Sequence, residues 1–436
     1  MHSDDDRIVR LFLGSALFWL VIGTTVGEYL GMKFIAPDMD AIPWLSFGRL
    51  RPVHTNAVFW GWASLGMMGL GHYVLPRVSG VRLQGKGLLK AALILINIAV
   101  LSGSIALMSG INNGGGEYRE YVWPIAILFA AGVALSFVSS WMTVARRTIG
   151  TIHISSWYIV SAHIFVLVIS IVAYLPYGQN GIGETIIQGY YMHQGVGMWF
   201  MMCTLGLFYY FIPDELETHI FSHRLGMVAF WSQILFYTVI GTHHFVFSSI
   251  PWWLQITAIL GSVGMVLPVV AGTVNFASCF RGHGRHAIRS VTLPFFMIAV
   301  FFYITGSLQG TAEAFQTTNL LWHFTDFSVA HSHMTMYGII TFALFGGIYV
   351  VLRRTSATPL PVSAIRLQFT LAIVGLLLYT VPLMIGGTLR GQSWIDGKPF
   401  IDSVVLMADY WLWRAIGGTL MWTSHLVAIV NFIRMR

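Results

Sequence analysis

"VAHSHMTMYG", residues 329–338, lies near the start of a long apolar run and places His331 and His333 two residues apart. At 3.6 residues per helical turn, two residues are about 200° of rotation, so the two imidazoles point to nearly opposite sides of a helix. Their heights along the helix differ by only about 3 Å. One metal ion could hardly bind both rings, but two ions on opposite sides of the helix can bind one ring each.

The composition indicates the class of protein to which this helix belongs. Of the 436 residues, 56% are hydrophobic and 9% are charged, whereas soluble proteins average about 25% charged residues. We therefore expect an all-α polytopic membrane protein with one integral membrane domain over residues 1–436. The net charge of +7 comes from basic residues in short loops between apolar runs, which is typical of membrane orientation and does not suggest nucleic acid.

Two further features restrict the chemistry of the chain. Cys203 and Cys279 belong to no CxxC or CxxCH pattern, which excludes a covalently attached haem c and a cysteine-ligated cluster within this chain. The N-terminal "MHSDDDRIVR" lacks the pattern of a cleavable signal, so we expect the first apolar stretch to be a retained anchor.

Apolar runs long enough to cross about 30 Å of hydrocarbon predict twelve transmembrane helices. An even number of spans places both termini on one side. That side would carry 17 of the 24 basic residues and the other side 7, so the positive-inside rule predicts cytoplasmic termini. The predicted spans are 9–31, 52–75, 88–109, 122–144, 155–175, 190–212, 225–248, 253–276, 291–312, 327–352, 366–386 and 409–433.

With this orientation, six histidines on four of the spans fall at a similar depth in the outer half of the membrane. Ionisable residues inside a membrane are costly and usually functional. A shared metal or haem centre is a better explanation of this common depth than six unrelated buried histidines. The six are His54, His193, His243, His244, His331 and His333.

The spacing of these histidines allows two kinds of site. An iron with two axial histidines is coordinatively saturated and transfers electrons, whereas an iron with one histidine keeps an open face for a gas. In "GTHHFVF", residues 241–247, His243 and His244 diverge by about 100° and reach one ion only if it lies against that helix end. His193 from a neighbouring helix would complete a trigonal site, which suits copper, or iron with an added carboxylate.

Most of the other histidines have a simpler interpretation. A single histidine inside a membrane span is more often a hydrogen-bonding partner between helices than a ligand. His72, His153, His163 and His425 have no partner pattern in the sequence, and we expect each of them to be an ordinary residue of this kind.

The order of the histidines resembles that of one known family over essentially the whole chain. One histidine in span two, one in span six, a pair ending span seven and an HxH in span ten are similar to the catalytic subunit of the haem–copper oxidase superfamily. The chain looks most like the C-family, the cbb-type cytochrome c oxidases. The segments that carry this resemblance are "RPVHTN" (51–56), "EYREYVWPI" (117–125), "YYFIP" (209–213), "HRLGMVAFW" (223–231) and "NLLWHFTDFSVAHSH" (319–333).

The resemblance implies a terminal respiratory oxidase that reduces dioxygen to water, with two haem b groups and one copper ion, CuB. His54 and His333 would be the axial ligands of the low-spin haem b, and His331 the ligand of the high-spin haem b. The remaining histidines of the set would hold CuB; they are His193, His243 and His244.

Tyr237, six residues before His243, matches the C-family position of the active-site tyrosine, which in that family is linked covalently to the histidine equivalent to His193. Nitric oxide reductases share the fold and the six histidines, but their non-haem iron uses a glutamate one turn after the span-six histidine. Here that position is Gly197. Copper and dioxygen are therefore expected, with nitric oxide reduction as the alternative.

The chain departs from the C-family pattern near the high-spin haem. The family has a glutamate 22 residues before the high-spin haem histidine, and this chain has Gln309 there, with Glu313 one turn further on the same helical face. A neutral amide does not take up and release protons as a carboxylate does. This difference leaves the alternative of an atypical nitric oxide reductase open.

The resemblance also implies groups around the haem propionates and a route for protons. Arg51 and His323 would pair with the propionates, and Glu120 is a candidate ligand for a calcium ion beside them. Protons must come from the cytoplasmic side if the reaction is to build a membrane potential. We therefore expect a proton path along the inner approach to the site, with Tyr237, Ser232, Gln233 and Thr238 of span seven and with Gln309 and Glu313 at the end of span nine.

The expected setting is the bacterial inner membrane, with the metal centres toward the periplasmic side. Membrane lipid, dioxygen, a cytochrome c-type donor and electron-donating subunits with haem c or CuA are the expected partners, and nucleic acid is not. A haem-free transporter or channel is the alternative from a different class, and a purified protein without a Soret band would establish it.

Overall fold

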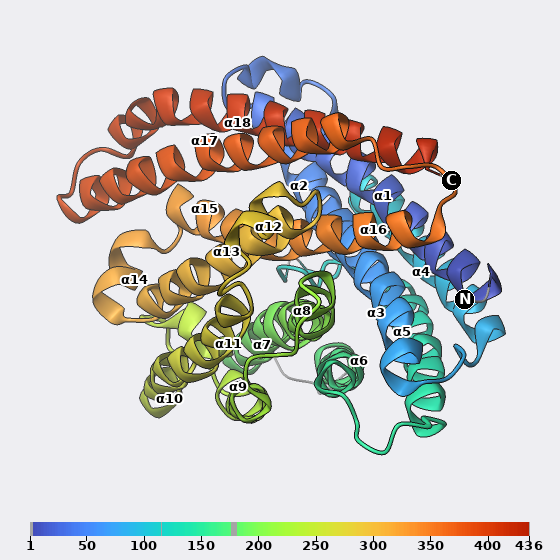
Figure 1. Cartoon of the computed structure of the whole chain (residues 1–436). Helices are drawn as coiled ribbons and strands as arrows, with labels where there is room; N and C mark the ends of the chain where they lie inside the picture. Colours follow the sequence, from blue (N-terminus) through green and yellow to red (C-terminus); the bar gives the residue numbers. More distant parts are fainter. Residues whose placement is uncertain (1–2, 115, 176–180, 436) are drawn as a thin grey trace.

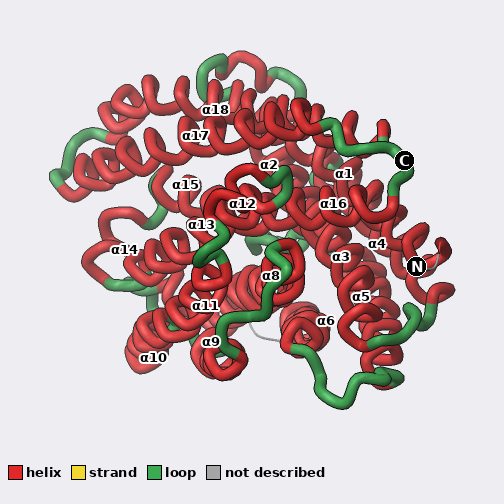
Figure 2. Tube along the Cα trace, viewed as in Figure 1, coloured by secondary structure: helices red, strands yellow, loops and turns green. Residues whose placement is uncertain are grey.

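Helices joined by short loops build the whole of the described chain (Figure 1). The computed structural model describes residues 3–114, 116–175 and 181–435, and within these ranges it contains no strand (Figure 2). The elements labelled η1, η2 and η5 are 3-10 turns, and η3, η4 and η6 are π-helical turns. All-α architecture, predicted from composition, is thereby confirmed.

The elements have the following bounds. In the first half of the chain they are α1 (Ser3–Met32), η1 (Pro37–Asp40), η2 (Pro43–Leu45), α2 (Phe47–Asn56), η3 (Ala57–Ala63), α3 (Ser64–Ser79), α4 (Lys86–Met108), α5 (Trp123–Ala145), α6 (Ile154–Tyr174), α7 (Ile182–Gln194), η4 (Gly195–Met201) and α8 (Met202–Glu215). In the second half they are α9 (His223–Tyr237), η5 (Gly241–Phe245), α10 (Trp252–Gly264), α11 (Val266–Cys279), α12 (Gly284–Arg289), α13 (Leu293–Glu313), α14 (Gln316–Trp322), α15 (Asp326–Thr335), η6 (Met336–Thr341), α16 (Phe342–Thr355), α17 (Val362–Ile395) and α18 (Phe400–Arg434).

These elements form the twelve predicted spans. Within the described ranges, 10 helices are long and apolar enough to cross a membrane. The other two spans are the continuous rod formed by α2, η3 and α3, and the segment formed by α9 and η5. The bounds differ most at α17 and α18, which are longer at both ends than the predicted 366–386 and 409–433.

Three of the four spans that carry the six histidines change to π geometry within three residues after a histidine. The π turn η3 follows His54, η4 follows His193, and η6 follows His333. A π turn inserts an extra residue and shifts the face of the helix that follows, and such turns are frequent at functional sites. The period of the apolar residues alone did not reveal these changes.

Span seven is interrupted where the sequence predicted a continuous helix over 225–248. The α-helix ends at Tyr237, and the 3-10 turn η5 carries His243 and His244. Gly189 of α7 and Gly241 of η5 lie in contact, since a Cβ on Gly189 would be 2.8 Å from the Gly241 carbonyl oxygen. This close approach of two backbones holds the histidine pair beside α7.

The arrangement of the helices agrees with an even number of spans. Figure 1 shows α17 and α18 side by side along one edge of the molecule, with both chain termini on the same side.

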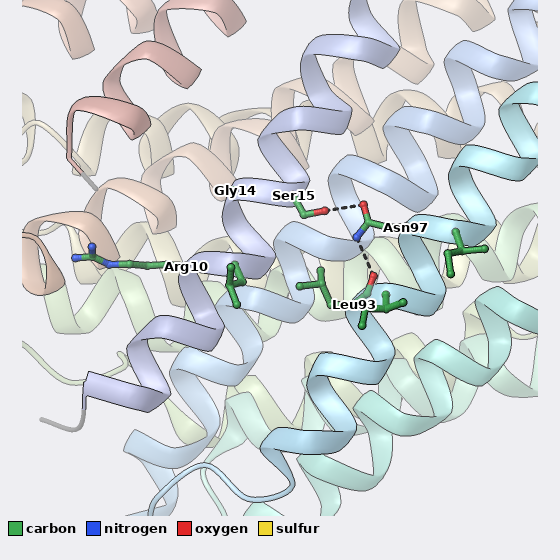
Figure 3. Close-up of a pocket in the computed structure, with 8 residues that line it drawn as sticks. Arg10, Gly14, Ser15, Leu93 and Asn97 are labelled. Carbon is green, nitrogen blue, oxygen red and sulfur yellow. Dashed lines mark hydrogen bonds between the residues drawn. The ribbon is translucent and has the colours of Figure 1, made fainter.

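A groove between α1 and α4 is drawn in Figure 3, where Ser15 Oγ donates to Asn97 Oδ1 at 2.8 Å and Asn97 Nδ2 donates to the Leu93 carbonyl at 2.8 Å. Arg10 points away from α4 and donates to Thr355 of α16 at 3.0 Å. Ser15 and Arg10 thus make contacts between helices, and Asn97 Nδ2 bonds its own helix.

Candidate metal centre

Three of the predicted ligand histidines form one cluster. The ligand atoms of His193, His243 and His244 lie within 4.8 Å of one another. The ring centroids are 4.5 Å apart for His193 and His243, 4.9 Å for His193 and His244, and 4.5 Å for His243 and His244. The structure therefore brings together residues that are 50 positions apart in the chain.

The hydrogen bonds of this cluster leave Nε2 of His243 as a lone pair that faces His193. Nδ1 of His243 lies 2.7 Å from Ser262 Oγ, whose own hydrogen goes to the Ala258 carbonyl at 2.7 Å. We therefore assign the His243 proton to Nδ1, which leaves Nε2 as a lone pair facing His193 Nε2 at 2.8 Å. His193 Nδ1 is buried and has no hydrogen-bond partner among the described residues. Three imidazoles whose ligand atoms lie this close together fit a single copper ion.

His331 faces this cluster from helix α15, and its ring is oriented by α13. Its Nδ1 lies 3.0 Å from Gln309 Oε1 and 3.5 Å from Glu313 Oε1. His331 interacts electrostatically with His193, His243 and His244. A histidine that donates from Nδ1 to a fixed acceptor presents Nε2 to a metal. Gln309, which stands where the C-family has a glutamate, and Glu313, one turn further on, therefore both lie near Nδ1 of His331.

His333 points to the other side of α15, as the 200° separation predicts. Its Nδ1 donates to the Val329 carbonyl at 2.8 Å, and its ring packs on Tyr379 of α17 with centroids 4.3 Å apart. His54 donates from Nδ1 to the Gly23 carbonyl at 2.7 Å, and the two histidines interact electrostatically. Within the described ranges the printed side-chain hydrogen bonds of both rings use Nδ1, which makes Nε2 the nitrogen that could bind a haem iron.

Sequence reasoning missed a group of charged residues beside this second pair. Arg414 of α18 is 11% exposed and lies near both His54 and His333. It shares Asp326 with Arg390, at 3.8 and 2.8 Å respectively, and Arg414 Nε is buried without a partner among the described residues. An arginine inside an apolar helix was a signal that could have identified it from the sequence.

The residues predicted near the propionates lie in or beside the loop between α4 and α5. Arg51 is paired with Glu117, and Glu120 accepts a hydrogen bond from Asn56 Nδ2 at 2.9 Å. Burial raises the pKa of the Glu120 carboxyl, although the Asn56 hydrogen bond opposes this shift. His323 packs 6.2 Å from His244 between ring centroids, and burial lowers its pKa. These residues lie beside the candidate metal centre, on the side of the loop that joins α4 to α5.

Tyr237 lies directly beside the three-histidine cluster. Its ring centroid is 5.1 Å from that of His193, and Gln194 Nε2 donates to its carbonyl at 2.7 Å. A Cβ on Gly197 would overlap the Tyr237 ring. The tyrosine ring therefore occupies the space that a side chain at position 197 would need.

The residues predicted for a proton path do not form a continuous chain of hydrogen bonds among the described residues. Ser232 and Gln233 lie on α9, Thr238 follows its end, and Gln309 and Glu313 lie on α13. Ser232 donates to the Val228 carbonyl at 2.5 Å, and Thr238 donates to the Ile234 carbonyl at 3.1 Å, so both hydroxyls bond their own helix. Gln233 Nε2 donates to the Gly197 carbonyl at 3.2 Å. Gln233 therefore joins α9 to the backbone of Gly197, which lies against the Tyr237 ring.

Comparison with known proteins gives one consistent result. The family described as "Cytochrome C and Quinol oxidase polypeptide I" matches residues 7–420. The cbb3-type cytochrome c oxidase subunit CcoN1 of Stutzerimonas stutzeri is 27% identical over 98% of this chain and 94% of its own length. A cytochrome c oxidase subunit 1 homolog of Agrobacterium tumefaciens is 25% identical over 98% of this chain and 83% of its own length.

Two more distant likenesses are also found. A subunit of the nitric oxide reductase of Stutzerimonas stutzeri is 22% identical over 94% of this chain and 88% of its own length. A heme–copper terminal oxidase dimer solved by cryo-EM superimposes with a TM-score of 0.80 at 14% identity, covering 100% of this chain and 84% of that one. At this identity the structural likeness shows the fold alone.

Proposed function

This chain belongs to the cytochrome c and quinol oxidase polypeptide I family, and from that premise we propose that it is the catalytic subunit of a terminal respiratory oxidase that reduces dioxygen to water at a high-spin haem b and CuB. Membership makes it an oxidoreductase with multiple membrane-spanning helices, and the family implies haem and copper. The choice of dioxygen over nitric oxide rests on the site.

The observation that carries this choice is the contact between Tyr237 and Gly197. A Cβ at position 197 would overlap the tyrosine ring, so a glutamate there and a tyrosine in this position exclude one another. The nitric oxide reductases that the sequence resembles need that glutamate for their non-haem iron. The chain has the phenol instead, which favours copper and dioxygen.

In this proposal each group of residues has one task. His193, His243 and His244 would hold CuB, His331 would hold the high-spin haem b, and His54 with His333 would hold the low-spin haem b. When bound, the metals supply electrons and an open position for the gas. Gln309 orients His331 through Nδ1 at 3.0 Å. Tyr237 would supply one proton and one electron when the O–O bond breaks.

The surroundings of the centre are part of the same proposal. The termini would be cytoplasmic and the metal centres would lie toward the periplasmic side of a bacterial inner membrane. Electrons would come from a cytochrome c-type donor through partner subunits with haem c or CuA. Arg51, His323 and the newly found Arg414 would pair with haem propionates, with Glu120 near a cation such as calcium.

Metal content and gas turnover, measured on one purified preparation, test the proposal. We expect about one copper for every two irons, a Soret band, and faster consumption of dioxygen than of nitric oxide. Iron without copper, together with preferred reduction of nitric oxide, would establish the reductase instead. A preparation without a Soret band would overturn both functions in favour of a haem-free protein.

A further inference from the structure

Two buried histidines outside the candidate metal centre share a single hydroxyl group. His72 of α3 and His163 of α6 are each 1% exposed. Nε2 of each ring lies 3.0 Å from Oγ of Ser136 on α5. The sequence shows no partner pattern for either histidine, and the structure joins them through a third helix. Ionisable groups inside membrane spans are expensive to bury and are usually functional.

The positions of the protons follow from the acceptors. His163 Nδ1 lies 2.8 Å from the Ile159 carbonyl, which can only accept, so Nδ1 carries the proton of the neutral ring. His163 Nε2 is then an acceptor and takes the hydrogen of Ser136. The Ser136 oxygen in turn accepts from Nε2–H of His72. This assignment leaves Nδ1 of His72 as a lone pair.

The lone pair on His72 Nδ1 is the position at which a proton can enter this series of hydrogen bonds. His72 Nδ1 is buried and has no hydrogen-bond partner among the described residues. A buried acceptor without a partner is unfavourable, and this lone pair is the basic site at which a proton can bind the chain. The opposite end is closed, because the Ile159 carbonyl cannot pass a proton on.

We propose that His72, Ser136 and His163 form a relay that takes up one proton and holds it inside the membrane. The proton binds Nδ1 of His72, the Nε2 proton of His72 moves to the Ser136 oxygen, and the Ser136 hydroxyl proton moves to Nε2 of His163. Every N–H or O–H bond that breaks is replaced by a new one, and no electron moves. The positive charge then resides on His163, where Nδ1–H remains bonded to Ile159.

The polar face of α5 indicates the side from which the proton comes. Ser139, Ser140 and Thr143 are fully buried. Ser140 lies one turn from Ser136 on the same face, and its hydroxyl also lacks a partner among the described residues. Ser139 donates to the Gln84 carbonyl at 2.5 Å, and the Gln84 amide donates to Thr143 Oγ1 at 3.1 Å. This stripe extends from the relay to the loop after α3.

The groups around the relay limit it to one proton. Phe12 of α1 packs on His72 with ring centroids 5.6 Å apart, and Trp199 of η4 packs on His163 at 5.1 Å. His72 and His163 act on each other electrostatically. Two positive rings joined by one hydroxyl would repel each other, with no carboxylate to compensate them.

Proton uptake on reduction of the holoenzyme tests the relay. Electrons added to the buried centre favour a proton in the same low-dielectric interior, and a pH indicator in weakly buffered solution counts the protons taken up. We expect Ser136→Ala to lower the uptake by up to about one proton per molecule. Ser136→Thr, which keeps a hydroxyl, should restore it. Ser170→Ala on α6 should match the wild type, since Ser170 donates to the Val166 carbonyl of its own helix and belongs neither to the relay nor to the polar stripe of α5.

Two results would overturn the relay. Equal uptake by the wild type and Ser136→Ala would show that the hydroxyl carries no proton, and loss in Ser136→Thr as well would show that packing is the cause. A second measurement needs no variant: infrared difference spectra of protein with ¹⁵N-labelled histidine rings should show an imidazolium signal on reduction, and its absence would equally reject the proposal. Haem spectra and turnover with each gas, recorded on the same samples, test the proposed function separately.

Discussion

A methyl group added at Gly197 would prevent the Tyr237 ring from lying beside His193. The sequence alone predicts Tyr237 from its register with His243 and shows that position 197 lacks a carboxylate. It does not show that the two positions compete for the same space, because the π turn Gly195–Met201 determines which face of the helix meets α9. The structure thus turns two separate sequence observations into one steric relation.

Gly197→Ala should therefore displace the Tyr237 ring. Overpacking of this kind costs about 1–3 kcal/mol, and we expect dioxygen turnover to fall by about tenfold or more. Gly195→Ala is the matched control in the same π turn, because its Cβ would meet only Ile169 and Trp60, both at 3.9 Å. Oxygen consumption and thermal unfolding of both variants check this. Equal activity of the two variants would contradict the proposed contact.

Removing only the phenolic hydroxyl tests the chemistry of the same residue. Tyr237→Phe keeps the ring that packs 5.1 Å from His193, so the cluster should stay assembled. We expect dioxygen turnover to be abolished while the haem spectra and the copper content remain close to those of the wild type. Full activity in this variant would reject Tyr237 as the proton and electron donor.

Among the elements, α13 and α15 show which properties of a helix the sequence predicts. The opposite directions of His331 and His333 follow from helical geometry, and the structure confirms them through their contacts with Gln309 of α13 and Tyr379 of α17. The contact of Glu313 with His331 depends on the position of α13 along the axis of α15. Sequence spacing fixes the rotation of a residue about its own helix, but not the sliding of one helix along another.

Changing Gln309 tests how α13 controls His331. Gln309→Leu removes the acceptor that lies 3.0 Å from Nδ1, and loss of such a partner typically costs about 10–100-fold in metal affinity or activity. Gln309→Glu keeps an acceptor in the same place and should retain the high-spin haem. Haem content, measured by spectroscopy after dilution or detergent washing, should fall in the first variant only. A stable high-spin haem in Gln309→Leu would show that Glu313 suffices.

For the whole molecule, hydropathy predicted the twelve spans because each must cross a similar thickness of hydrocarbon. The common depth of six histidines then followed from the order of the spans. The ligand roles remain predictions, although the structure brings the six into two groups. The relay of His72, Ser136 and His163 could not be foreseen, because it depends on which of the twelve helices are neighbours, and no single helix contains the pattern.

The orientation of the molecule in the membrane is the prediction that belongs to this largest scale. Both termini lie on one side in Figure 1, and the predicted topology places 17 basic residues on that side and 7 on the other. By the positive-inside rule a fluorescent protein fused to the C-terminus should therefore fold and fluoresce, and a periplasmic phosphatase fused at the same point should be inactive. Fusion of the phosphatase in the loop after α17 is the matched control and should be active. The opposite pattern would place the candidate metal centre toward the cytoplasm and would remove the basis for a proton supply from the side of the termini.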